Sequence, residues 1–344
     1  MDNPLANDLN HVLDHTHNLW DELHGTHIFI TGGTGFFGKW ILESLLWAND
    51  KLDLDCRATV LTRHPNRFRA SVPHLARHRV ISILKGDVRT FDFPSGIFTH
   101  IIHAATDASS QLNAETPLLM LDTIVEGTRH TLDFAKSCGA KKLLFTSSGA
   151  VYGKQPPDIT HIPEDYNGAP DPLDPNSAYG EGKRLAELLC SLYADSNLEV
   201  KIARCFAFVG PYLPLDTHFA IGNFIRDAIN GDPIIIKGDG TPYRSYLYSA
   251  DLAIWLWTIL ISSKSLRVYN VGSDEDMSIN QVTTAVSNQL NPPPIVKTMK
   301  SKIPGKQPER YVPSITRARR ELNLDTWVSV EDGIGRTIKY HRDC

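Results

Sequence analysis

Two residues able to do acid–base chemistry, Tyr179 and Lys183, stand four positions apart in the segment SAYGEGK (177–183), which runs into the helical pattern RLAELLCSLY. On a helix they project from one face about one turn apart, so the ammonium can lie near the phenol. A positive neighbour favours phenolate and lowers a pKa that is otherwise about 10, which suits proton transfer near neutral pH. By itself the spacing also fits an ordinary surface pair.

A third polar group, Ser148, ends the apolar run KLLFTSS (142–148), which is typical of a buried strand. Ligands bind at the carboxyl ends of strands in open α/β sheets, so Ser148 is placed to hydrogen-bond a substrate hydroxyl or carbonyl oxygen beside Tyr179. From this stretch alone, an ordinary serine in a turn explains the residue equally well.

A glycine-rich turn, GGTGFFG (32–38), lies directly between the strand-like run HIFIT (27–31) and the helical pattern KWILESLL. Gly32 allows a tight turn, Gly35 lets the backbone approach a pyrophosphate, and Gly38 lets helix and strand pack closely. The N-terminus of the helix adds amide donors and a favourable dipole. The strand before and the helix after favour dinucleotide binding over a simple turn.

The end of the next strand, where an NAD site usually carries an acidic residue, has Thr62 and Arg63, followed by HPNR (64–67). A guanidinium there suits the 2′-phosphate of NADP(H), because it can form bidentate, charge-assisted hydrogen bonds with phosphate. The alternative is a solvated loop, above all for Arg67. The pattern therefore favours NADP(H), with NAD(H) as the alternative.

The elements that must position these residues alternate between short apolar runs and longer periodic segments, which predicts parallel βαβ units and a Rossmann-type, doubly wound α/β fold. Strands are predicted at 27–31, 57–62, 81–86, 100–105, 142–148 and 200–205. Residues 1–24 are predicted as a helical extension with a packing role and 25–210 as the dinucleotide-binding domain with the catalytic residues. From Pro211 the sequence changes to loops with short strands at 233–238 and 267–272, so 211–344 is predicted to be mainly a smaller, substrate-binding α/β lobe.

Composition excludes several classes of protein. The 344 residues are 42% hydrophobic and 22% charged, with a net charge of -4, which favours neither nucleic-acid nor membrane binding. The five cysteines form neither a C-x-x-C pair nor a metal-binding spacing, so reduced thiols, a cytoplasmic location and no metal site are expected.

Taken together, residues from about Thr26 to Thr337 resemble the extended short-chain dehydrogenase/reductase superfamily, in particular its nucleotide-sugar epimerase/dehydratase branch. The resemblance implies that Ser148, Tyr179 and Lys183 are catalytic, and that Tyr179 and Lys183 also contact the cofactor. The other cofactor contacts that it implies are Gly32, Gly35, Phe36, Phe37 and Gly38 of the turn, Asp87 and Val88 near the adenine, and Ala104 and Ala105 after His103.

The same resemblance implies a nucleotide-diphosphate sugar as substrate. Ser148 would contact the sugar, and Asn223 and Arg244 would contact the diphosphate, which an amide and a guanidinium suit chemically. It also implies a homodimer in which two helices from each chain pack into a four-helix bundle.

Departures from the branch narrow the reaction. Its 4,6-dehydratases carry Asp-Glu directly after the catalytic Ser/Thr and its decarboxylases a glutamate, whereas this chain has Gly149 and Ala150. Without an acid or base there, elimination of that type is not expected. Ala207, Ile124 and Ser314 also replace residues common in relatives, but they leave the catalytic set intact.

The favoured activity is a 4-ketoreductase acting on a 4-keto-6-deoxy sugar, with hydride to C4 and a proton from Tyr179. One alternative is a nucleotide-sugar C4 epimerase with the same residues. An alternative of another class is a dinucleotide-binding sensor or scaffold without catalysis, against which the intact Ser148, Tyr179 and Lys183 argue.

Overall fold

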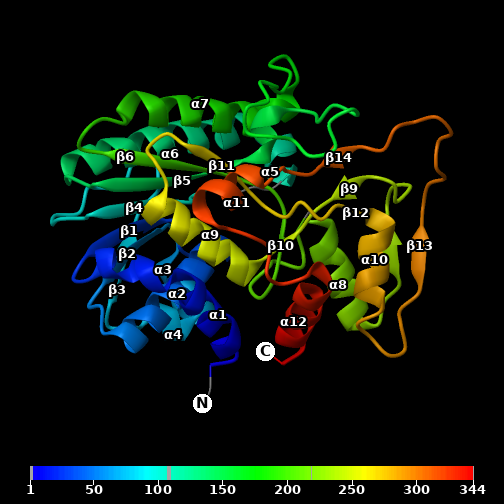
Figure 1. Cartoon of the computed structure of the whole chain (residues 1–344), viewed down its shortest axis with the longest axis horizontal. Coiled ribbons are helices and arrows are strands. Elements are labelled where there is room, and N and C mark those ends of the chain that lie inside the picture. The colour runs from blue at the N-terminus through cyan, green and yellow to red at the C-terminus, as the bar shows by residue number, and fades with distance from the viewer. Residues whose placement is uncertain (1–2, 107–109, 218, 344) are drawn as a thin grey trace.

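Seven strands form one parallel sheet in the computed structural model, which describes residues 3–106, 110–217 and 219–343 (Figure 1). The strands are β1 His27–Thr31, β2 Arg57–Thr62, β3 Ile81–Lys85, β4 His100–His103, β5 Lys142–Ser148, β6 Glu199–Cys205 and β11 Val268–Val271. Their order, β11-β6-β5-β4-β1-β2-β3, winds outwards from β1 in both directions. This is the predicted doubly wound Rossmann topology.

Helices cover both faces of the sheet. On one face lie α6 (Pro117–Ser137) and α7 (Ala178–Tyr193), and on the other lie α1 (Ala6–Thr16), α2 (Phe36–Leu52) and α9 (Ser249–Ser262). Every α9 residue from 249 to 260 is buried, because this helix lies between the sheet and α1. A helix that is apolar all round must be covered on every side, which explains why α1 is present.

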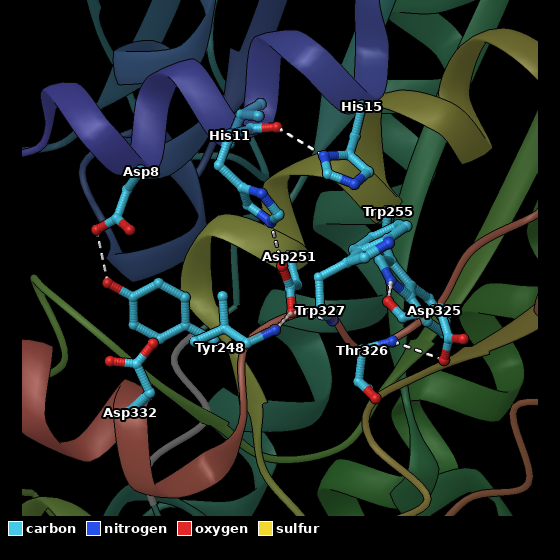
Figure 2. A network of polar contacts seen from close by, with 12 residues as sticks. Asp8, His11, His15, Tyr248, Asp251, Trp255, Asp325, Thr326, Trp327 and Asp332 are labelled. Carbon is cyan, nitrogen blue, oxygen red and sulfur yellow. Dashed lines mark hydrogen bonds and ion pairs between the residues drawn. The ribbon is translucent and has the colours of Figure 1, made fainter.

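The N-terminal segment has the predicted packing role. It forms α1 and the 3-10 helix η1 (His17–Leu23), and a polar network joins α1 to α9 and to the C-terminal segment (Figure 2). Asp251 accepts hydrogen bonds from the backbone N–H groups of Trp327 and Val328, at 3.0 Å each, and its other oxygen lies 2.8 Å from His11 Nε2. The two ends of the described chain are thereby tied to the same buried carboxylate.

The C-terminal part of the chain builds a smaller lobe with two small sheets. β9 (Tyr243–Arg244) lies between β12 (Met277–Ser278) and β14 (Arg310–Tyr311), and β13 (Val296–Thr298) pairs with β8 (Ile234–Ile236). Beside them lie α8 (Ala220–Asn230), α10 (Ile279–Ser287) and α12 (Val330–Asp343). The remaining elements are α3 Pro65–Ser71, α4 Pro73–Ala76, α5 Ser110–Glu115, η2 Gly149–Tyr152, η3 Pro175–Ser177, β7 Phe208–Val209, β10 Leu247–Tyr248 and α11 Thr316–Leu322.

The strand predicted at 267–272 does not belong to the smaller lobe, and that assignment was wrong. As β11 it pairs with β6 in parallel, from Val268 opposite Ile202 to Val271 opposite Cys205, and so forms the edge of the main sheet. Tyr269, Asn270 and Val271 are buried. The chain returns to the main sheet after α9, and the local pattern of a short strand carries no information on which sheet it joins.

None of the helices in the described ranges is long and apolar enough to cross a membrane. Cys56, Cys138, Cys190 and Cys205 are free thiols, and Cys344 lies outside the described residues.

Candidate active site

The glycine turn approaches the end of β4 so closely that side chains do not fit. Gly32 has φ +73°, and a Cβ there would lie 2.3 Å from the carbonyl oxygen of Ala104. A Cβ on Gly38 would lie 2.3 Å from Gly33 Cα, so the first turn of α2 packs directly against the loop. Gly35 is different, because a Cβ there would meet its nearest atom, Gly32 O, at 3.4 Å.

The N-terminus of α2 lies at this turn. Gly35 is the N-cap residue, the helix begins at Phe36, and its first turn carries no acidic residue. Free backbone N–H groups and the helix dipole there suit a diphosphate. The ring of Phe37 packs on the ring of Phe208, with the two ring centroids 5.0 Å apart. The loop therefore has the close approach and the donors that a dinucleotide requires.

Cationic side chains gather at the ends of β2 and β3. A hollow of about 590 Å³ there is lined by Arg63, His64, Pro65, Asn66, Arg67, Arg69 and Lys85. Asp87, predicted near the adenine, binds Arg89, with Arg89 Nε 2.9 Å from Asp87 Oδ1. These hydrogen bonds hold the pKa of the Asp87 carboxyl below its usual value. The Thr62 hydroxyl accepts a hydrogen bond from His64 N at 3.2 Å.

The other predicted cofactor residues lie around the end of β4. Ala104 faces Gly32, and the backbone N–H of Ala105 donates to Thr31 Oγ1 at 3.2 Å. Val88 is buried against Gly127 of α6, where a Cβ would lie 2.8 Å from Val88 Cγ1. Ala104 and Ala105 thus share one corner with the glycine turn, and Val88 packs beside α6.

Lys183 is buried and held in place by two hydrogen bonds. Its Nζ donates to the backbone oxygen of Thr146 at 2.8 Å and to Thr106 Oγ1 at 3.0 Å. It also lies over the Phe145 ring, 4.7 Å from the centroid. Burial lowers the pKa of this ammonium to about 8. Lys183 is therefore fixed under the strand ends rather than exposed on the surface of α7.

Tyr179, on the first turn of α7, lies beside Ser148 at the end of β5. Burial raises the pKa of Tyr179 to about 12, and the neighbouring Ser148 opposes that rise. The spacing of Tyr179 and Lys183 in the sequence predicts that Lys183 lowers this pKa. The structure places the ammonium 6.0 Å from the Tyr179 ring centroid, and desolvation of the phenol raises its pKa instead.

Tyr311 is a residue of the site that the sequence analysis did not identify. It reaches Ser148 from β14 of the smaller lobe, and its ring packs on Phe206 with centroids 4.7 Å apart. Its hydroxyl lies 2.7 Å from the position that a Cβ on Gly149 would occupy. The glycine after Ser148 was therefore a signal that another group fills this space.

Of the two predicted diphosphate contacts, Arg244 lies beside Tyr311. β9 and β14 place it opposite Tyr311, and the guanidinium is 6.0 Å from the Tyr311 ring centroid. Asn223 lies on α8, where its Oδ1 accepts a hydrogen bond from Arg226 Nη1 at 3.1 Å. The structure thus connects Arg244 to Ser148 through Tyr311, whereas the contact described for Asn223 stays within α8.

The sequence profile of the NAD dependent epimerase/dehydratase family matches residues 28–272, more than half of the chain. The chain belongs to this family. UDP-glucuronic acid decarboxylase 1 of Xenopus tropicalis is 30% identical over 317 residues, which cover 92% of this chain and 72% of that protein. UDP-glucuronic acid decarboxylase 5 of Arabidopsis thaliana is 28% identical over 312 residues, covering 89% and 86%. The resemblance to the epimerase/dehydratase branch is confirmed.

Solved structures agree with the fold. A UDP-glucuronic acid 4-epimerase from Bacillus cereus, in complex with UDP-glucuronic acid and NAD, superposes with a TM-score of 0.78 at 22% identity, over 92% of this chain and 99% of that one. DesIV, a dTDP-glucose 4,6-dehydratase from Streptomyces venezuelae, gives 0.77 at 24% identity over 92% and 97%. The family and the curated relatives make the chain a nucleotide-sugar-modifying enzyme of the NAD dependent epimerase/dehydratase family.

In this epimerase/dehydratase-family enzyme the two residues after Ser148 carry no carboxyl group. Gly149 and Ala150 present no ionisable group, and the adjoining space holds the phenol of Tyr311 and the ring of Phe206. Two nearby glutamates are engaged elsewhere. Glu187 pairs with Arg204, and Glu164 accepts a hydrogen bond from the backbone N–H of Asn270 at 3.0 Å. The described side chains around Ser148 thus include the phenols of Tyr179 and Tyr311 and the thiol of Cys205.

Proposed function

We propose that this enzyme is an NADPH-dependent reductase that delivers hydride to C4 of a 4-keto-6-deoxy nucleotide-diphosphate sugar. The observation that carries the proposal is the cation-lined hollow at the ends of β2 and β3, with Arg63, Arg67, Arg69 and Lys85. A 2′-phosphate placed there would meet several cations, whereas the NAD ribose is usually bound by an acidic side chain.

Protonation at the catalytic centre supports the same direction of reaction. When bound, the nicotinamide supplies hydride transfer. Burial raises the pKa of Tyr179 to about 12, so near neutral pH its phenol carries the proton that a reduction must give to the substrate oxygen. Ser148 adds a hydrogen bond to that oxygen, and Lys183, held by Thr146 and Thr106, binds the ribose.

The surroundings of Ser148 argue against elimination and against decarboxylation like that named for the curated relatives. Gly149 and Ala150 carry no carboxyl group, and Glu164 and Glu187 are bound elsewhere. Arg244, beside Tyr311, is the proposed diphosphate contact, with Asn223 on α8 as a second.

The decisive experiment is a substrate screen. UDP-, dTDP-, CDP- and GDP-sugars and their 4-keto derivatives are incubated with NADPH or NADH, and the absorbance of the reduced cofactor is followed. We expect oxidation of NADPH with a 4-keto substrate. If the protein purifies with bound NAD⁺ and interconverts two C4 epimers without added cofactor, it is an epimerase. If it binds dinucleotide and turns over none of the sugars, the sensor alternative replaces catalysis.

The preference for NADPH has its own test in Arg63→Asp. The substitution should raise KM for NADPH by about tenfold or more and leave KM for NADH nearly unchanged, because a carboxylate repels a 2′-phosphate and can bind a ribose hydroxyl. Arg77→Asp, at an exposed position after α4 and outside the hollow, is the matched control. Equal effects of Arg63→Asp on both cofactors would refute the assignment of this hollow.

We also propose a homodimer through α6 and α7. Leu185, Leu188 and Leu192 are 43%, 53% and 71% exposed at helical spacing along α7, and Leu118 on α6 is 75% exposed. An apolar strip on two adjacent helices is the surface that a four-helix bundle buries. Leu188→Lys should convert the dimer to monomer in sedimentation, whereas Leu173→Lys, in an exposed loop, should not. A wild-type protein that sediments as a monomer would end the proposal.

A further inference from the structure

One carboxylate, that of Glu187 on α7, is bonded to two neighbouring strands of the main sheet. Its Oε1 accepts hydrogen bonds from Ser147 Oγ at 2.5 Å and from Arg204 Nε at 2.9 Å, and its Oε2 accepts one from Arg204 Nη2 at 2.6 Å. Ser147 lies on β5 and Arg204 on β6, directly opposite each other in the parallel register. The carboxylate therefore joins three elements at one point.

That point lies among the residues of the catalytic centre. Tyr179, Lys183 and Glu187 follow one another at intervals of four residues, so they project from one face of α7. On β5, the serine that binds Glu187 stands between Ser148 and Thr146, whose backbone oxygen accepts the hydrogen bond from Lys183 Nζ at 2.8 Å. A slide of α7 along β5 would therefore displace the phenol from Ser148 and the ammonium from Thr146 together.

Apolar packing does not by itself prevent such a slide. The residues of α7 that pack on the sheet include Ala186, Leu189 and Cys190, all of them buried. Contacts of this kind fix how closely a helix approaches a sheet, but they have no preferred direction along it. Hydrogen bonds weaken steeply when their distance or angle changes, so those of Glu187 define a place along the strands.

Arg204 is a fixed partner for this carboxylate. Its Nη1 donates to the backbone oxygen of Glu164 at 3.3 Å, and its guanidinium lies 4.7 Å from the centroid of the Tyr152 ring. The side chains of Glu187 and Arg204 are 12% and 15% exposed. Two parallel hydrogen bonds between a guanidinium and a carboxylate fix the orientation of both groups, and this pair is largely shielded from water.

We propose that Glu187 is a positioning residue that sets the place of α7 along β5 and β6, and with it the positions of the Tyr179 phenol and the Lys183 ammonium in the catalytic centre. The inference rests on the proposed roles of Tyr179 and Lys183. A misplacement of reacting groups by about 1 Å can cost on the order of 10²-fold in rate, so a small slide of α7 should be measurable in kcat.

The test is Glu187→Gln. Glutamine has the same shape and keeps an oxygen for Ser147, but its NH₂ group meets the N–H groups of Arg204 as donor against donor, which pushes α7 from its place. We expect kcat to fall about tenfold with whichever nucleotide sugar the enzyme converts. The sugar KM should stay nearly unchanged, because the proposed diphosphate contacts lie on β9 and α8.

A second measurement does not need turnover. Lys183 is the proposed ribose contact, so its displacement in Glu187→Gln should raise the Kd of the dinucleotide about threefold, the worth of part of one hydrogen bond. The titration uses NADPH or NADH, whichever the wild type binds more tightly. Ser147→Ala, which removes one hydrogen bond and keeps the ion pair, should lower kcat about threefold and carries the test if Glu187→Gln does not fold.

The matched control is Asp8→Asn. It breaks a buried ion pair of the same kind on α1, on the opposite face of the sheet, where Asp8 binds Arg336 and Tyr248. Like Glu187→Gln, it should lower the midpoint of thermal unfolding, because removing one partner leaves a buried charge unpaired. Unlike Glu187→Gln, it should leave kcat and the dinucleotide Kd unchanged.

Two results would overturn the proposal. One is a Glu187→Gln enzyme with a lower unfolding midpoint but with the kcat and dinucleotide Kd of the wild type, and the other is an equal loss of kcat in Asp8→Asn. Failure of the proposed function looks different, because the wild type would then not reduce a 4-keto sugar. The variants are in that case compared on the substrate that the enzyme does convert, and without any turnover the dinucleotide titration decides.

Discussion

At the scale of single residues, the site depends on keeping polar groups out of water in defined protonation states. Tyr179 is held as a phenol, with its pKa raised to about 12 by burial, and the pKa of Lys183 is lowered to about 8 by burial. Ser148 lies between two phenols and a backbone N–H group. Each of these side chains is fixed before substrate arrives, which reduces the reorganisation that proton transfer requires.

The first prediction concerns Tyr179→Phe. It should lower turnover by about 10²-fold or more, because a positioned general acid is lost. The fold and the cofactor Kd should be unchanged, since the ring remains and the hydroxyl makes its contact with Ser148. Turnover and cofactor binding by calorimetry measure the two effects. Near-normal turnover would show that another group delivers the proton.

The residues that could be predicted from the sequence are those with a local motif. The glycine turn, Ser148, and the Tyr179–Lys183 pair stand in short segments whose spacing indicates what they do. Tyr311 could not be found that way, because it reaches the site through pairing of β14 with β9, far away in sequence. The net pKa of Tyr179 could not be predicted either, since it depends on how much water the completed fold excludes.

At the scale of elements, β1, the glycine turn and α2 form one unit in which each glycine has a different task. A Cβ on Gly38 would press on the backbone of Gly33 at 2.3 Å, whereas one on Gly35 would meet Gly32 O at 3.4 Å. Gly38 is therefore required for packing. Gly35 is required only if the cofactor comes close to the backbone there.

The second prediction separates the packing role of Gly38 from the cofactor-binding role of Gly35. Gly38→Ala should destabilise the fold by about 2 kcal/mol or more, because neither backbone segment can move away without distorting α2 or the turn. Gly35→Ala should leave the unfolding midpoint almost unchanged and weaken cofactor binding, because the methyl group enters the space predicted for the pyrophosphate. Thermal unfolding and cofactor titration of both variants provide the measurements. Equal cofactor affinity of Gly35→Ala and wild type would remove Gly35 from the binding surface.

Strand prediction succeeded where an apolar run has clear ends. β1, β2 and β5 coincide with the predicted runs, because each is a short, buried, β-branched or aromatic segment. The position of β11 could not be deduced from its sequence, since a strand of four residues fits either lobe. The chain reaches β11 only after α9 has crossed the sheet, and that long-range packing decides its partner.

At the scale of the whole molecule, buried polar residues join parts of the chain that are far apart in sequence. Asp8 accepts a hydrogen bond from Tyr248 at 2.6 Å and pairs with Arg336 of α12, while Asp251 connects α1 to the segment before α12 (Figure 2). Near the centre of the sheet, His103 lies between two threonine hydroxyls, 2.7 Å from Thr31 Oγ1 and 3.0 Å from Thr128 Oγ1. It thereby connects β4 with β1 and α6, beside the predicted cofactor turn.

The last prediction concerns stability in acid. Burial lowers the pKa of His103 from 6.5 to about 3, with Lys183 acting in the same direction, so the folded protein resists a proton that the unfolded chain accepts below pH 6.5. The contribution is therefore present above pH 6.5 and is lost as pH falls toward 3. Between pH 7 and 5, linkage with these values lowers the free energy of unfolding by about 2 kcal/mol.

The variant His103→Gln tests this contribution. Glutamine keeps one donor and one acceptor for the two threonines but does not take up a proton between pH 7 and 5. Over this interval, the free energy of unfolding of His103→Gln in urea titrations should therefore fall by about 2 kcal/mol less than that of the wild type. His17→Gln, at an exposed position, should follow the wild type. If His103→Gln loses as much stability as the wild type between pH 7 and 5, other groups are responsible for the sensitivity to acid, and His103 does not resist protonation in the folded protein.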